Sequence, residues 1–127
     1  MVTVSTLPQT RSYHHGDLRT ALVEAGLKAL ESAPIEELSL RALAREAGVS
    51  ATAVYRHFPD KQALLAALAD AGLTRLGRFQ QEAADAVAPE QAFGATGRAY
   101  VRWALANPAL FRLVFACNDA LGETVFG

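Results

Sequence analysis

Residues 39–58 read SLRALAREAGVSATAVYRHF, with Gly48 near the middle. Apolar residues recur at helical spacing on both sides of Gly48, which predicts two short helices joined by a tight turn. Two helices joined in this way cross steeply, so their backbones need a small residue where they approach and a residue that tolerates positive φ in the turn. Ala44 and Gly48 meet these needs, and Val54 is the apolar residue that packs the second helix on the first. The spacing is that of a helix-turn-helix.

The helices around this turn are each predicted to begin with a capping residue and a hydrophobic staple. Ser39, Ser50 and Asp60 each precede an apolar set, and each is flanked by the apolar pair of a hydrophobic staple. After Asp60 the apolar periodicity continues without a proline until Pro89. The pattern therefore predicts a long helix of about seven turns after the two short ones.

Helical patterns also fill the rest of the chain. A first helix is predicted at roughly 17–32, because helical periodicity there is stopped by Pro34. Pro89 suits another helix start, Asn107-Pro108 suits a stop and restart, and residues 110–116 predict a further apolar helix. Strand alternation, internal repeats and low-complexity tracts are absent from the sequence. The fold class predicted is all-α.

Composition sets the limits on the kind of protein. The chain has 127 residues, is 51% hydrophobic and carries a net charge of −1, which suits one packed domain or a small domain with part of another. The longest apolar run, Ala63–Ala69, is too short to cross a bilayer, and residues 1–12 read as a polar tail without a basic head and apolar stretch. We therefore expect a cytoplasmic protein with no membrane contact. The single Cys117 predicts neither a disulfide nor a zinc site.

The second helix of the turn has a surface suited to DNA. Its outward face is expected to carry Ala51, Thr52, Ala53, Tyr55 and Arg56. Small residues allow close approach to base edges, whereas hydroxyls and cations contact phosphates. Within residues 39–61 four cations stand against two carboxylates, leaving +2 in a chain that is acidic overall. A patch of this size predicts weak, salt-dependent binding for one module, so useful affinity would need two modules on one duplex.

Three segments of the sequence resemble parts of one known protein family. SLRALAREAGVSATAVYRHFPDKQALL, residues 39–65, closely resembles the DNA-binding signature of the TetR family of transcriptional regulators, and YHHGDLRTALVEAGLKAL, residues 13–30, resembles the family's first helix. YVRWALANPALFRLVF, residues 100–115, resembles the start of a ligand-binding domain in one TetR subgroup. The resemblance implies a three-helix DNA-binding domain at 13–60 and a helical regulatory domain for effector binding and dimerisation at 61–127. Because family members continue with further helices after ETVFG, that second domain is expected to be incomplete in this chain.

The resemblance also implies partners and contact residues. It implies a homodimer that reads a palindromic double-stranded operator and is released from it by a small-molecule effector, usually as a repressor. The implied DNA-binding residues are Ser39, Arg41, Ser50, Thr52, Ala53, Tyr55, Arg56, His57 and Lys61. Thr52 and Ala53 would face bases, and Tyr55, His57 and Lys61 would contact phosphates. Thr52 replaces the glycine that is commoner in the family and adds a methyl and a hydroxyl at the groove.

Aromatic residues gather in the C-terminal part of the chain. The candidate effector-pocket residues are Phe93, Tyr100, Trp103, Phe111 and Phe115. Their simpler interpretation is core packing, as it is for Phe58 and, as an alternative to a phosphate contact, for Tyr55. On the long helix, Arg75, Arg78, Asp70 and Glu82 are most simply a solvated face.

Catalysis and cofactors have little support in the sequence. There is no glycine-rich phosphate loop, no nucleophile elbow and no carboxylate pair with a partner base, so neither an enzyme nor a bound cofactor is expected. His14, His15 and His57 do not complete a metal site with Asp17 or Cys117, because adjacent histidines point apart on a helix. The alternative to a DNA-binding regulator is a helical module whose helix-turn-helix binds a protein partner.

Overall fold

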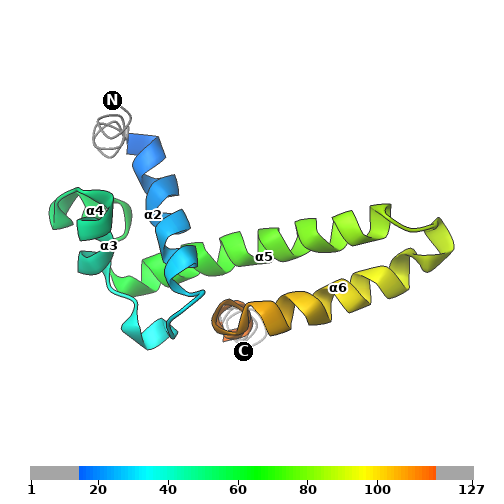
Figure 1. Ribbon diagram of the computed structural model, residues 1–127. Coiled ribbons are helices and arrows are strands. Elements are labelled where there is room, and N and C mark those ends of the chain that lie inside the picture. Colours follow the sequence, from blue (N-terminus) through cyan, green and yellow to red (C-terminus); the bar gives the residue numbers. More distant parts are fainter. Residues whose placement is uncertain (1–14, 117–127) are drawn as a thin grey trace, which may run out of the picture. The chain divides into compact units, whose positions relative to one another are not determined.

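The computed structural model describes residues 15–116, and every regular element within that range is helical (Figure 1). The prediction of an all-α fold is therefore confirmed. The chain divides into two compact units, Met1–Ala67 and Leu68–Gly127. In chain order the elements are α2 (His15–Ala29), η1 (Ile35–Glu37), α3 (Leu40–Ala47), α4 (Ala51–His57), α5 (Lys61–Asp85), η2 (Pro89–Gln91) and α6 (Ala92–Ala106), followed by helical residues 108–116.

Three helices, α2, α3 and α4, pack against one another in the N-terminal unit. On α3 the buried residues recur three and four positions apart and form one apolar stripe: they are Leu40, Leu43, Ala44 and Ala47. The most deeply buried large side chains of this unit are Leu22, Val54, Phe58 and Leu64. As predicted, Val54 from α4 and Phe58 after it belong to the core.

The three helix starts predicted at Ser39, Ser50 and Asp60 each have a side-chain cap. The Ser39 Oγ accepts a hydrogen bond from the Ala42 N–H at 3.2 Å, and the Ser50 Oγ accepts one from the Ala53 N–H at 3.1 Å. At the start of α5, an Asp60 carboxylate oxygen accepts from the Ala63 N–H at 2.8 Å. These bonds satisfy backbone donors that have no partner inside the helix, so all three predicted caps are confirmed.

The turn between α3 and α4 depends on Gly48. Its backbone is left-handed, with φ 73° and ψ 29°. The Gly48 N–H donates to the Arg45 carbonyl at 3.2 Å, and the Val49 N–H donates to the Ala44 carbonyl at 3.0 Å. This pair of bonds is the Schellman arrangement, which closes a helix with a residue of positive φ. The predicted need for glycine at this position is confirmed.

Gly48→Ala is expected to lower the free energy of unfolding by about 1–2 kcal/mol, because a Cβ is strained in the left-handed region. Urea unfolding followed by circular dichroism measures the change. Gly48→Asn should cost less, since asparagine enters this region more readily. Equal losses for the two variants would contradict the role of backbone conformation here.

The long helix α5 begins at Lys61 and continues into the C-terminal unit. Its 25 residues make about seven turns, as the sequence predicted. In the C-terminal unit the Gln80 side-chain N–H donates to the Thr96 carbonyl of α6 at 3.2 Å. The Asn107 side chain then donates to the Trp103 carbonyl at 3.0 Å, and this bond closes α6 before helical residues 108–116. The predicted stop and restart at Asn107-Pro108 is confirmed.

Gly72 allows α5 to approach helical residues 108–116 closely. A Cβ built on Gly72 would lie 2.8 Å from Leu110 Cδ1 and 2.9 Å from Leu110 Cγ. Leu110 is itself buried, at 4% exposure, so it has little room to move away. The absence of a side chain at Gly72 is therefore part of the packing of this unit.

Gly72→Ala is expected to destabilise the C-terminal unit by about 1–2 kcal/mol, because overpacking outweighs the gain in helix propensity. Fluorescence of Trp103, the single tryptophan of the chain, follows the urea unfolding of this unit. Gly77→Ala is the matched control on the same helix, since nothing lies within 4 Å of a Cβ there. Gly77→Ala should stabilise by about 0.5–1 kcal/mol, and a similar gain for Gly72→Ala would contradict the packing argument.

Helix boundaries differ from the prediction at two places. The first helix was predicted at roughly 17–32 but runs His15–Ala29. After it, the Glu31 N–H donates to the Lys28 carbonyl three residues back, so the chain tightens before Pro34 and leaves the α-helix early. The start predicted at Pro89 is also a 3-10 turn, η2, that leads into α6.

Candidate nucleic-acid interface and effector site

The exposed face of α4 carries the side chains predicted to meet DNA. Thr52, Tyr55 and Arg56 are all exposed, Tyr55 at 41%, while Val54 on the opposite face is fully buried. Ala51 and Ala53 are half-buried beside them. Val54 therefore fixes the rotation of α4 and turns a small, hydroxyl-bearing and cationic surface outward.

The two serines of the predicted contact set also cap helices. Ser50 is exposed and Ser39 is half-buried, and each uses its hydroxyl oxygen as an acceptor for a backbone N–H. A serine hydroxyl carries a donor as well as its acceptor lone pairs. Both serines can thus cap a helix and still donate an O–H to a phosphate oxygen.

Basic side chains lie on the helices around α4. Arg41 and Arg45 of α3 are exposed. Lys61, at the first position of α5, is half-buried, and its ammonium donates to the Glu36 carbonyl of η1 at 3.4 Å. An ammonium has three donors, so this bond leaves Lys61 with donors for a second acceptor. Lys61 therefore has a structural contact in addition to the phosphate contact predicted for it.

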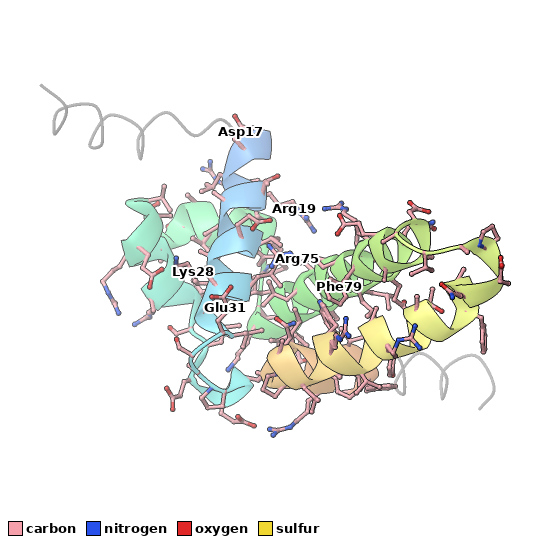
Figure 2. All side chains as sticks on the ribbon, turned by 45° about the vertical axis from the view of Figure 1, so that its right-hand side comes forward. Asp17, Arg19, Lys28, Glu31, Arg75 and Phe79 are labelled. Atoms are coloured by element: carbon pink, nitrogen blue, oxygen red, sulfur yellow. The ribbon has the colours of Figure 1, made fainter. Side chains whose placement is uncertain are left out.

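Arg19 is a cation near α4 that the sequence reasoning missed. The exposed guanidinium of Arg19 lies 5.1 Å from the centre of the Phe58 ring, within cation–π range. The half-buried His57 ring is 6.5 Å from the same ring. Figure 2 shows Arg19 close to Asp17 towards the beginning of α2. Arg19 thus adds a positive charge beside the end of α4.

The aromatic residues predicted to form an effector pocket are only partly brought together. Tyr100 and Phe111 meet edge to face at 5.8 Å, and Phe111 and Phe115 meet at 4.5 Å. The place of Phe93 in a pocket wall stays a prediction, and its side chain is 91% exposed. The reason for this exposure is helical phase: α6 buries Ala95, Ala99 and Trp103, and a residue two positions before Ala95 points away from that face.

A different hollow lies between α5 and α6 in the C-terminal unit. It has a volume of about 290 Å³ and is shallow and wide open to solvent, and its lining residues are Arg75, Arg78, Phe79, Glu82 and Trp103. Figure 2 shows Arg75 and Phe79 on α5. The hollow shares only Trp103 with the predicted aromatic set. The sequence predicts a solvated face for Arg75, Arg78 and Glu82, because their spacing alone does not reveal a concave surface.

Residues 15–116 contain neither a membrane-spanning helix nor a metal-binding cluster. No helix in this range has both the length and the apolar character needed to cross a membrane. The same residues hold no group of three histidine, cysteine or acidic side chains placed to share a metal ion. His14 and Cys117 lie outside the described residues.

The sequence is similar to known regulatory proteins. Residues 22–68 match the family model described as bacterial regulatory proteins, tetR family. The nucleoid occlusion factor SlmA of a Marinomonas species is 35% identical over 113 residues, covering 85% of this chain and 55% of that protein. The tetracycline repressor protein class C of Escherichia coli is 45% identical over 56 residues, covering 44% of this chain and 26% of that protein. The chain therefore spans about half or less of the length of these relatives.

Proposed function

We propose that residues 22–68, which match the model of the tetR family of bacterial regulatory proteins, form a DNA-binding domain with which the protein binds operator DNA sequence-specifically and regulates transcription. The observation that carries the proposal is the orientation of α4, which buries Val54 and exposes Thr52, Tyr55 and Arg56. In a helix-turn-helix, such a face enters the major groove. This regulation takes place in the cytoplasm and needs no catalytic group.

Within this proposal the contact residues have separate tasks. Thr52 and Ala53 face base edges, because a methyl and small side chains allow close approach there. Tyr55, His57 and Lys61 contact phosphates, and Arg56 contacts a base or a phosphate. The remaining members, which approach the DNA backbone at helix starts and on α3, are Ser39, Arg41 and Ser50. Arg19 joins them as a further cation.

The protein is proposed to act as a homodimer on a palindrome. Two helix-turn-helix modules on one face of a duplex place their recognition helices about 34–36 Å apart, one turn of DNA. A patch of charge +2 on one module binds weakly alone, so a second module supplies the affinity that a regulator needs.

Release from DNA by a small molecule is proposed as the regulatory step. The α5 helix starts at Lys61, directly after the helix-turn-helix, and ends at Asp85 in the C-terminal unit. A ligand that shifts this helix would change the spacing of the two recognition helices and favour the unbound state. One similar protein is named a repressor, which favours repression over activation.

Fluorescence anisotropy tests the DNA-binding proposal. The chain is titrated against duplexes from its own upstream intergenic region and against scrambled duplexes of equal length. We expect at least about 1,000-fold tighter binding to a palindromic duplex than to the scrambled one at physiological salt. Weak binding that is equal for both duplexes would contradict the proposal and favour the alternative of a protein-interaction module.

A second candidate function comes from the relative that covers most of the chain. The Marinomonas protein that is similar over 85% of this chain is named a nucleoid occlusion factor. With this function the chain would act on the nucleoid, so its DNA sites need not lie at promoters. Mapping the bound sites across the genome separates the two functions, and septa that form across the nucleoid in a deletion strain would favour the second.

A further inference from the structure

The hollow between α5 and α6 combines charged and aromatic side chains. Arg75, Arg78, Phe79 and Glu82 lie three, four and seven positions apart, so they share one stripe of α5. Trp103 of α6 completes the lining and is buried at 6% exposure, whereas Phe79 is 39% exposed. The concave surface therefore has a fixed aromatic residue on one helix and an accessible ring and two guanidinium groups on the other.

From this arrangement we infer that the hollow binds a planar aromatic acid, with its carboxylate on Arg78 and its ring against Phe79 and Trp103. A guanidinium matches a carboxylate with two parallel hydrogen bonds. Aromatic side chains favour the faces and edges of another ring. The hollow has a volume of about 290 Å³ and is wide open, so it leaves room for one ring with a carboxylate to lie against its lining.

The three charged residues of the hollow are not equivalent. Arg75 is half-buried and already engaged in another interaction, so the carboxylate is assigned to the exposed Arg78. Glu82 lies four positions after Arg78 and opposes an anion, and it therefore lowers the affinity of the hollow for one. The binding of an aromatic acid stands on this geometry alone, whereas its role as the effector rests on the proposed function.

Trp103 makes this inference directly measurable, because it is the single tryptophan of the chain. Benzoate is titrated into the full chain while tryptophan fluorescence is excited at the red edge of its absorption, where benzoate does not absorb. We expect a saturable change with benzoate, and binding at least about 10-fold weaker for the neutral benzamide and for the cationic benzylammonium. A response of equal affinity for benzamide, or no saturable response to benzoate, would overturn the inference.

Substitutions locate the site. Arg78→Gln is expected to weaken benzoate binding about 10-fold, because it removes a charge-assisted hydrogen bond. Glu82→Gln should tighten binding about 2-fold by removing the opposing charge. Arg102→Gln is the matched control, since Arg102 is exposed on α6 beside Trp103 but does not line the hollow. Equal weakening by Arg78→Gln and Arg102→Gln would place the benzoate elsewhere.

The DNA titration with added benzoate separates the inference from the proposed function. Tight operator binding that weakens with benzoate supports both. Saturable benzoate binding through Arg78 without any change in operator affinity supports the hollow as an aromatic-acid site and contradicts its role as the effector site. Tight operator binding without benzoate binding overturns the inference and leaves the DNA-binding proposal standing.

Discussion

Phe58→Ala is expected to lower the free energy of unfolding of the N-terminal unit by about 3–5 kcal/mol. Phe58 is 1% exposed, directly follows α4 and supports the Arg19 guanidinium on its ring. Its loss leaves a cavity and removes the cation–π contact. Because domains are typically stable by only about 5–15 kcal/mol, this variant should be largely unfolded in mild urea. Circular dichroism at increasing urea measures the effect.

Phe93→Ala is the matched control for Phe58→Ala. The same side chain is removed, but Phe93 is 91% exposed and fills no core space. A change within about 0.5 kcal/mol is expected. If both variants lost the same stability, Phe58 would not anchor the end of α4, and the orientation of that helix would lack its main support.

A triple variant, Tyr55→Ala, Arg56→Ala and Lys61→Ala, is expected to weaken operator binding by about 100-fold or more. Each side chain is proposed to contact the duplex, and loss of one such contact costs about 1–3 kcal/mol. The slope of log affinity against log salt should also fall in magnitude by about 2, because two cations no longer displace counterions. Fluorescence anisotropy at several salt concentrations measures both effects.

Lys28→Ala with Arg112→Ala is the control for the triple variant. These two exposed cations lie outside the proposed interface, and their removal changes net charge by the same amount. Operator affinity should change less than about 3-fold, through long-range screening alone. A comparable loss in this control would mean that affinity depends on overall charge, and the assignment of α4 as the reading surface would be wrong. Circular dichroism of each variant confirms that the helices are intact.

The N-terminal unit was predictable because its signals are local. Ser39, Ser50 and Asp60 each cap a helix within three residues of their own position. The turn needs glycine because of the positive φ of Gly48 itself. The burial of Val54 follows from its spacing from Gly48 in the sequence. These local interactions are the same in the folded protein as the sequence predicts, because no distant residue competes with them.

The features that the sequence did not predict depend on contacts between helices that are far apart in the sequence. Arg19 lies over Phe58 from a helix that begins far earlier in the chain, and no spacing rule connects the two. The hollow appears only when α5 and α6 are packed, which brings Trp103 to the stripe of Arg78 and Phe79. Phe93 lies near other aromatics in the sequence, whereas the rotation of α6 decides which of them face inward.

The left-handed turn at Gly48 also limits which substitutions the gene can tolerate at this position. Single-nucleotide changes of a glycine codon encode alanine, valine, serine, cysteine, arginine, tryptophan, aspartate or glutamate, and of these aspartate is the residue that visits this backbone region most readily. Asparagine, the better substitute, lies two nucleotide changes away. Most single-nucleotide substitutions at codon 48 therefore destabilise the protein. Random mutagenesis should recover folded variants with a substitution at Gly48 far less often than variants with one at the exposed Gly77.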